Sequence, residues 1–146
     1  MVTIDTPRTA PTTASATTPF SRGRFAIVVG AAAVVNLVVF FAGSAAGASM
    51  VVTTGATTQL IALLPAIATV VPLTLAGVAT WLVARRLPVL RVVAGWAGAV
   101  IALCSTAAPL IMSSDAATGL ALAVMHVVAG VAWFVAIMTG RNSEVR

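Results

Sequence analysis

Four side chains at a similar depth inside long apolar runs of the sequence carry groups able to bind or react: Asn36, Thr69, Cys104 and His126. Counted inward from one end of its run, each lies about nine residues deep, which is roughly 13 Å at a helical rise of about 1.5 Å per residue. We therefore predict that an amide, a hydroxyl, a thiol and an imidazole form one polar layer.

Two roles are open for Asn36 and His126. A hydrogen bond between them would join the first and last apolar runs, and such contacts are worth about 0.6 kcal/mol each. Alternatively, His126 is an axial ligand or a proton-handling group in a cavity, and Asn36 orients it. Cys104 is expected to be an inert, buried, small hydrophobic residue.

The chemistry that the sequence lacks is also informative. The apolar runs contain no Asp, Glu, Lys or Arg, which argues against an ion-coupled pump. One Cys and one His cannot make a tetrahedral metal site, and the chain has no CxxC, HExxH, Ser/His/Asp or phosphate-binding glycine pattern. We expect no metal, no cofactor and no enzymatic activity.

Composition indicates what surrounds these side chains. The 146 residues are 60% hydrophobic and 8% charged, and their mean hydropathy is +1.11. So many apolar residues cannot fit inside a globule of this size, so most of them must face lipid. A soluble enzyme, a disulfide-rich module and a disordered protein are excluded. The net charge of +5 comes from arginines beside the apolar runs rather than from one patch, so no nucleic-acid partner is expected.

The sequence predicts an all-α integral membrane protein, an antiparallel four-helix transmembrane bundle. Its spans are expected at about 25–45, 60–84, 92–112 and 117–139. A loop over 46–59, a basic turn over 85–91 and a polar turn over 113–115 would connect them. Residues 1–24 would form a disordered, Thr/Pro/Ala-rich cytoplasmic tail, and residues 140–146 a second cytoplasmic tail.

The arginines predict the orientation. They flank the first span, fill the turn between the second and third spans, and follow the fourth: Arg22, Arg24, Arg85, Arg86, Arg91, Arg141 and Arg146. The positive-inside rule then places both termini in the cytoplasm of a bacterial cell, with the spans in its inner membrane. Trp81, Trp96 and Trp133 lie toward the same ends of their spans, as an interfacial aromatic belt would.

Prolines and glycines mark places where helices could bend or meet. Pro65, Pro72 and Pro109 lack an amide hydrogen and are expected to kink the second and third spans. A paired kink at the first two could open a lateral cavity for a lipid, a quinone or a small hydrophobic solute.

Gly43 and Gly47 form a GxxxG motif near the end of the first span, which would permit close helix packing within the bundle or between protomers. Asp115 precedes the fourth span and is expected to cap that helix, the alternative being a ligand role at the outer mouth.

Residues 36–47 and 121–130, together with the arginine-rich central turn, resemble small four-span membrane proteins of high-GC Gram-positive bacteria. These form the domain-of-unknown-function family numbered six thousand and sixty-nine. The resemblance covers residues 25–138 and implies a four-helix integral membrane domain with no assigned activity. It also implies that Asn36 and His126 occupy polar positions of the family.

Three functions are compatible with these observations. The first is a non-enzymatic protein that assembles with itself or serves as a small subunit of a membrane complex. The second is a transporter or channel for a neutral or hydrophobic solute, which would need a dimer to form a pathway. The third is a membrane redox or quinone-binding protein that uses His126. The expected partners are the lipid bilayer and either a second copy or a membrane complex.

Overall fold

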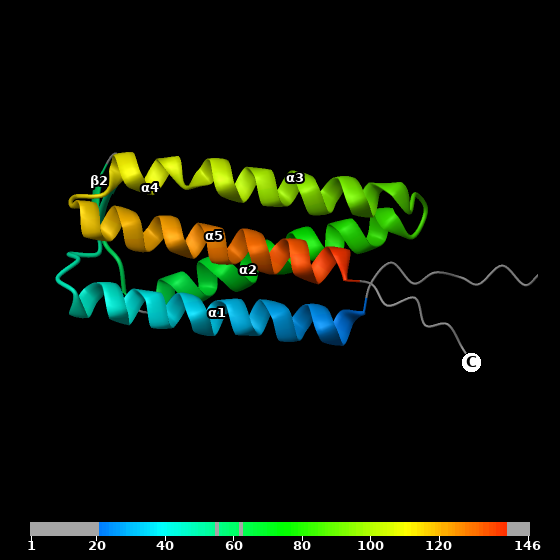
Figure 1. The fold of residues 1–146 in the computed structure, drawn as a ribbon, viewed down its shortest axis with the longest axis horizontal. Coiled ribbons are helices and arrows are strands. Elements are labelled where there is room, and N and C mark those ends of the chain that lie inside the picture. The colour runs from blue at the N-terminus through cyan, green and yellow to red at the C-terminus, as the bar shows by residue number, and fades with distance from the viewer. Residues whose placement is uncertain (1–20, 55, 62, 140–146) are drawn as a thin grey trace, which may run out of the picture.

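Four long helices lie side by side in an antiparallel bundle (Figure 1). The computed structural model describes residues 21–54, 56–61 and 63–139. The first span is α1 (Arg22–Ala45), the second α2 (Leu63–Ala84), the third α3 (Val89–Ser105) with α4 (Ala107–Met112), and the fourth α5 (Ala116–Met138). The predicted all-α four-helix fold is confirmed. The predicted tails at 1–20 and 140–146, with Arg141 and Arg146, lie outside the described residues.

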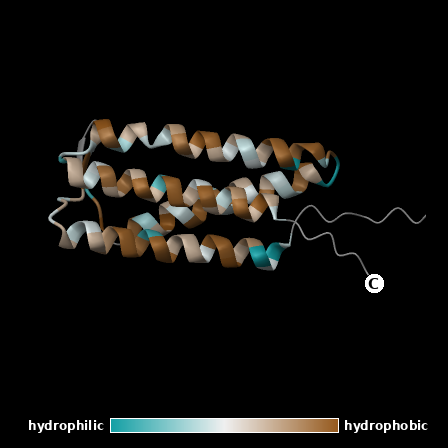
Figure 2. Ribbon diagram, viewed as in Figure 1, coloured by the Kyte–Doolittle hydropathy of each residue, from teal (hydrophilic) through white to brown (hydrophobic). Residues whose placement is uncertain are grey.

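Each span is long and apolar enough to cross a membrane. Apolar residues cover all four helices, and polar ones gather at the start of α1 and in the α2–α3 turn (Figure 2). Large hydrophobic side chains such as Ile27, Leu75 and Ile101 are about two-thirds exposed or more. In water such a surface would be unstable, so this architecture is that of a multi-pass membrane protein.

The third span is interrupted at Thr106. Pro109, three residues later, cannot donate an amide hydrogen to the carbonyl of Ser105, and its ring crowds that carbonyl. The amide of Thr106 instead donates to the carbonyl of Leu103 at 3.1 Å, a tighter turn than an α-helix makes. A kink was expected at Pro109, and the observed break lies about one turn before it.

The connection between α1 and α2, predicted as a loop over 46–59, is partly extended. It contains an antiparallel hairpin, β1 (Val51–Thr54) and β2 (Ala56–Gln59), in which Val51 pairs with Gln59. Its β-branched residues favour extended backbone. The amide of Ser114 donates to the carbonyl of Val51 at 3.0 Å, which ties the hairpin to the turn before α5.

The helices are packed unequally. In its most apolar 18-residue stretch α5 has 39% of its residues buried, whereas α2 has 11% and the third span 6%. The α5 helix packs against both α1 and α3, so it lies at the centre of the bundle. The buried core consists of a cluster around Phe40, Met50 and Met125, toward the hairpin end of the bundle, and a second cluster around Trp133 and Ile137, toward the arginine end.

Small residues bring α3 and α5 together. Gly98 lies against the indole of Trp133, and Gly130 lies against Ala102. Trp133 is only 6% exposed, and its Nε1 donates to the carbonyl of Ala94 at 2.8 Å. The assignment of Trp133 to an interfacial belt was therefore wrong, because α3 leaves a space for this side chain within the bundle.

The glycines of the first span do not form a shared helix face. The α1 helix ends at Ala45, and Gly47 follows it with a φ of 90°. The amides of Ala48 and Gly47 donate to the carbonyls of Gly43 and Ser44 at 3.0 and 3.1 Å, which is the Schellman ending that a glycine at this position favours. Gly43 packs within the bundle, against Met50 and against Ala121 of α5.

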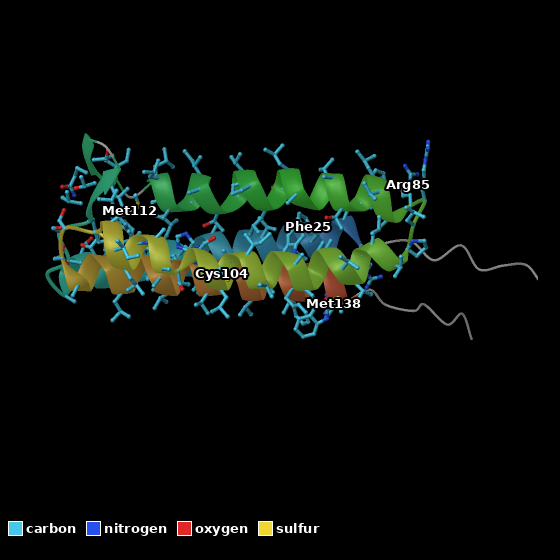
Figure 3. The ribbon with its side chains drawn as sticks, turned by 90° about the horizontal axis from the view of Figure 1, so that it is seen from above. Phe25, Arg85, Cys104, Met112 and Met138 are labelled. Atoms are coloured by element: carbon cyan, nitrogen blue, oxygen red, sulfur yellow. The ribbon has the colours of Figure 1, made fainter. Side chains whose placement is uncertain are left out.

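The two ends of the bundle differ in charge. The described arginines all lie where α1 begins, where α2 turns into α3, or close by; Figure 3 shows Arg85 at this end and Met112 at the other. Arg91 reaches across to α5 and donates through Nε and Nη2 to the carbonyls of Ile137 and Met138, at 2.7 and 2.9 Å. A cation at this helix end satisfies free carbonyls and favours the helix dipole.

Candidate functional site

A buried chain of hydrogen bonds links α1 to α2 and α5 between the two apolar clusters. Asn36 Nδ2 donates to Thr69 Oγ1 at 2.7 Å and to the carbonyl of Met125 at 3.4 Å. Thr69 Oγ1 in turn donates to the carbonyl of Pro65 at 2.7 Å. Asn36 is 2% exposed and Thr69 4%. Two of the four predicted polar side chains are thus in direct contact.

These partners fix the orientation of the Asn36 amide. The carbonyl of Met125 can only accept a hydrogen bond, and the Thr69 hydroxyl has already used its proton on Pro65. Both positions therefore need the amide's NH₂ group. The amide oxygen, Oδ1, must point the other way.

Asn36 Oδ1 is buried, and no group in residues 21–54, 56–61 or 63–139 donates to it. A buried acceptor without a donor costs about 1–3 kcal/mol, because it has lost water and gained nothing in exchange. Such atoms are few in native proteins. In the part of the chain that the structure describes, this oxygen marks the place where a further hydrogen bond would be most favourable.

His126 does not bond to Asn36. Its Nδ1 lies 2.8 Å from the carbonyl of Leu122, one turn earlier in α5. The predicted bond between Asn36 and His126 was therefore wrong: each side chain finds a nearer partner. Since a carbonyl only accepts, Nδ1 carries the proton, and in the neutral ring Nε2 is left with a free lone pair.

Asn36, Thr69 and His126 nevertheless line one cavity of about 170 Å³, between α2 and α5, which contact each other only weakly. The other lining residues are apolar and come from the segment just before α2, from the start of α2 and from α5: Leu60, Leu64, Pro65, Ala68, Leu122, Met125 and Ala129. His126 is half-buried in this wall. The cavity is thus an apolar space with a few polar groups, the usual composition of a small-molecule site.

A comparison with known protein families gives a match for this chain. The model of a family of unknown function, DUF6069, matches residues 16–143, which include every helix described above. The chain belongs to this family. No curated protein and no solved structure matches it.

In this DUF6069 chain the fourth predicted layer residue, Cys104, lies elsewhere. It is exposed on α3 (Figure 3) and does not line the cavity. The expectation that it is buried was wrong. Cys is a small apolar residue, and the lipid-facing side of a membrane helix suits it as well as the core does.

The prolines of α2 act differently from the expected pair of kinks. Pro65 lies in the first turn of the helix, where an amide hydrogen would have no partner, so it does not interrupt the helix. Only Pro72 lies inside α2, where it cannot donate to the carbonyl of Ala68. Both Pro65 and Ala68 line the cavity, so the early part of α2 forms its wall.

The end of this DUF6069 bundle that carries the hairpin also carries a polar cluster around Asp115. As expected, Asp115 caps α5: its Oδ1 accepts from the amide of Thr118 at 2.8 Å. Its Oδ2 accepts from the hydroxyls of Ser49 and Thr118 at 2.5 and 2.7 Å. These bonds, led by that of the Ser49 side chain, hold the pKa of Asp115 well below its usual range, so the carboxylate stays ionised.

The same cluster fixes Met50 between the end of α1 and the hairpin. Its backbone has a φ of 54°, which non-glycine residues rarely adopt, and its amide donates to Thr118 Oγ1 at 2.9 Å. Met50 and Thr118 are 2% and 0% exposed. Neither Ser49 nor Thr118 is among the residues predicted from the sequence. Thr118 could have been found from the sequence, because it lies three residues after the predicted cap Asp115, and the side chain of a cap accepts a hydrogen bond from the amide at that position.

The described residues include no group of three or more His, Cys, Asp or Glu side chains that could hold a metal ion. The cavity offers hydrogen bonding through Asn36 and His126 and apolar contact through the surrounding aliphatic side chains.

Proposed function

We propose that this protein is a non-enzymatic multi-pass membrane protein that takes a small neutral molecule from the bilayer into the cavity between α1, α2 and α5. The observation that supports this function is the buried, unpartnered Oδ1 of Asn36, a residue that lines the cavity. A ligand that donates a hydrogen bond to this oxygen removes the penalty that the unliganded protein bears.

The polar groups define the ligand's chemistry. Asn36 Oδ1 accepts, and so does Nε2 of a neutral His126, so the ligand must bring a donor such as a hydroxyl group. The remaining wall is apolar and calls for an apolar body. In size, a dry cavity of about 150 Å³ in another protein holds benzene, so the 170 Å³ here suits one ring or a short chain.

The packing supports lateral entry. The α2 helix has far fewer buried residues than α5 and meets it only weakly, so the wall that it forms is the one that can move. Because Asn36 Oδ1 is covered in the present arrangement, the donor enters together with such a movement.

This proposal selects among the three functions that the sequence left open. It favours the handling of a neutral or hydrophobic solute. A redox role would require the hydroxylated, reduced form of a quinone, since an oxidised quinone offers only acceptors. Self-assembly loses its expected seam, because Gly43 contacts its own chain and Gly47 lies beyond α1. A second copy would still complete a path across the membrane.

A pair of matched probes tests the site. para-Fluorophenol has a hydroxyl donor, and para-fluoroanisole carries a methyl group in its place. Both are titrated into the full chain in nanodiscs at equal membrane concentration and followed by fluorine NMR. We expect the phenol to bind about tenfold more tightly, since the anisole leaves Asn36 Oδ1 unpaired.

Two variants provide the controls. Asn36→Leu should remove the tenfold preference while the anisole still binds, which also shows that the cavity remains formed. Ala129→Phe should fill the cavity and abolish binding of both probes. Equal binding of the two probes to the wild type, or a preference that persists in Asn36→Leu, would contradict the proposal, as would no binding of either.

We also propose that both termini lie in the cytoplasm and that the membrane is the bacterial inner membrane. Support comes from the arginines at the end where α1 begins and α5 finishes. Alkaline phosphatase, which is active only outside the cytoplasm, should be active when fused after Ala45 or Met112 and inactive after Ala84 or Met138. The reverse pattern would overturn this orientation.

A further inference from the structure

Two arginines share one tryptophan at the inner end of α1 and α2. The guanidinium carbons of Arg22 and Arg85 each lie 4.2 Å from the centre of the Trp81 ring. Arg22 is the first residue of α1, and Arg85 follows the last residue of α2. Contact with the ring limits the freedom of both long side chains, so their charges are held in place rather than dispersed in solvent.

Among the described residues, no acidic side chain near Arg22 and Arg85 balances these charges. In residues 21–54, 56–61 and 63–139 the one acidic side chain is Asp115, which lies at the opposite end of the bundle as the cap of α5. Two cations that share one ring repel each other, and the ring's π-electrons offset this repulsion only in part. The pair therefore favours an anion that can accept hydrogen bonds from both guanidinium groups.

An apolar groove begins at the same place. A cavity of about 280 Å³ between α1 and α2 is lined by Arg22, Phe25, Thr74, Gly77, Val78 and Trp81. From Trp81 to Thr74 the wall runs about 10 Å along α2, at about 1.5 Å per residue. Gly77 lets the Phe25 ring approach α2, because a Cβ there would lie 2.2 Å from that ring. The groove thus runs from charged groups into the hydrocarbon region.

We infer that this groove binds an anionic phospholipid. The phosphate of its headgroup lies between the guanidinium groups of Arg22 and Arg85, and one acyl chain lies along Phe25, Gly77 and Val78. Guanidinium groups match phosphate oxygens in geometry as well as charge, and basic pockets between membrane helices suit anionic headgroups. The site shares no lining residue with the cavity of Asn36, so it is independent of the proposed function.

Native mass spectrometry of the full chain tests this inference. The protein is exchanged into detergent with equal amounts of phosphatidylglycerol and phosphatidylcholine that carry the same acyl chains. We expect the phosphatidylglycerol adduct to be about tenfold more abundant, because choline already neutralises its own phosphate. The double variant Arg22→Gln/Arg85→Gln should lose this preference.

The matched control removes the same charge from the same end of the bundle. Arg24→Gln/Arg86→Gln spares both contacts with Trp81 and should keep the preference. If both double variants lose the preference for phosphatidylglycerol equally, general surface charge explains it and the inference is overturned. The absence of this preference in the wild type would also overturn the inference. Soluble glycerol phosphate serves as the last probe: if it displaces the lipid at equal concentration, the acyl groove contributes nothing and that part is wrong. Asn36→Leu should leave lipid retention unchanged.

Discussion

Gly98→Ala is expected to separate α3 from α5 and to destabilise the bundle by about 3 kcal/mol or more. A Cβ at this position would lie 2.0 Å from Trp133 Nε1 and 2.4 Å from its Cδ1. Moving the indole aside would cost free energy, because Nε1 donates a hydrogen bond to the carbonyl of Ala94 and the ring packs in the buried cluster with Ile137. Thermal unfolding in detergent micelles, followed by circular dichroism, measures the effect.

Gly30→Ala is the matched control. Gly30 lies inside α1 with nothing within 4 Å of its hypothetical Cβ. Alanine forms helices more readily than glycine by about 1 kcal/mol, so this variant should unfold at the same temperature as the wild type or higher. The same substitution thus has opposite effects at the two sites. If Gly98→Ala unfolds no earlier than Gly30→Ala, the close packing of Gly98 on Trp133 does not stabilise the fold.

The second large effect is expected at Thr118. Thr118→Val keeps the shape of the side chain but removes the acceptor of the buried Met50 amide and a donor to Asp115. We expect a loss of about 2–3 kcal/mol, since an unpaired buried amide alone costs about 1–3 kcal/mol. Thermal unfolding under the conditions used for Gly98→Ala gives the value.

Thr118→Ser separates the hydroxyl from the methyl group. It keeps both hydrogen bonds and loses one carbon, which is worth about 0.8 kcal/mol. The serine variant should therefore lie much closer to the wild type than the valine variant does. Similar losses in both would mean that the methyl group, rather than the hydrogen bonds, makes Thr118 important.

The spans could be predicted because hydropathy is a property of consecutive residues. A helix long enough to cross the membrane needs only an uninterrupted apolar run, and each of the four runs provides one. The depth of Asn36, Thr69 and His126 could be estimated for the same reason, and all three do line one cavity.

What each side chain contacts could not be predicted, because it depends on how each helix is rotated about its axis. Such rotation set Asn36 against Thr69 instead of His126, and it turned Cys104 outward. The hydropathy of α2 gives little help, since its lipid-facing and inward sides are both apolar. The hairpin did carry a signal in the sequence, since two Val and two Thr residues precede a glycine and two further Thr residues follow it.

The central place of α5 determines when the bundle can be completed. Asn36 and Met125, which bond to each other, are 89 residues apart in the chain. Both interfaces of α5, with α1 and with α3, must wait until the ribosome has made the last span. The first three helices therefore enter the bilayer with their small-residue faces against lipid, and the core forms only after α5 has been made.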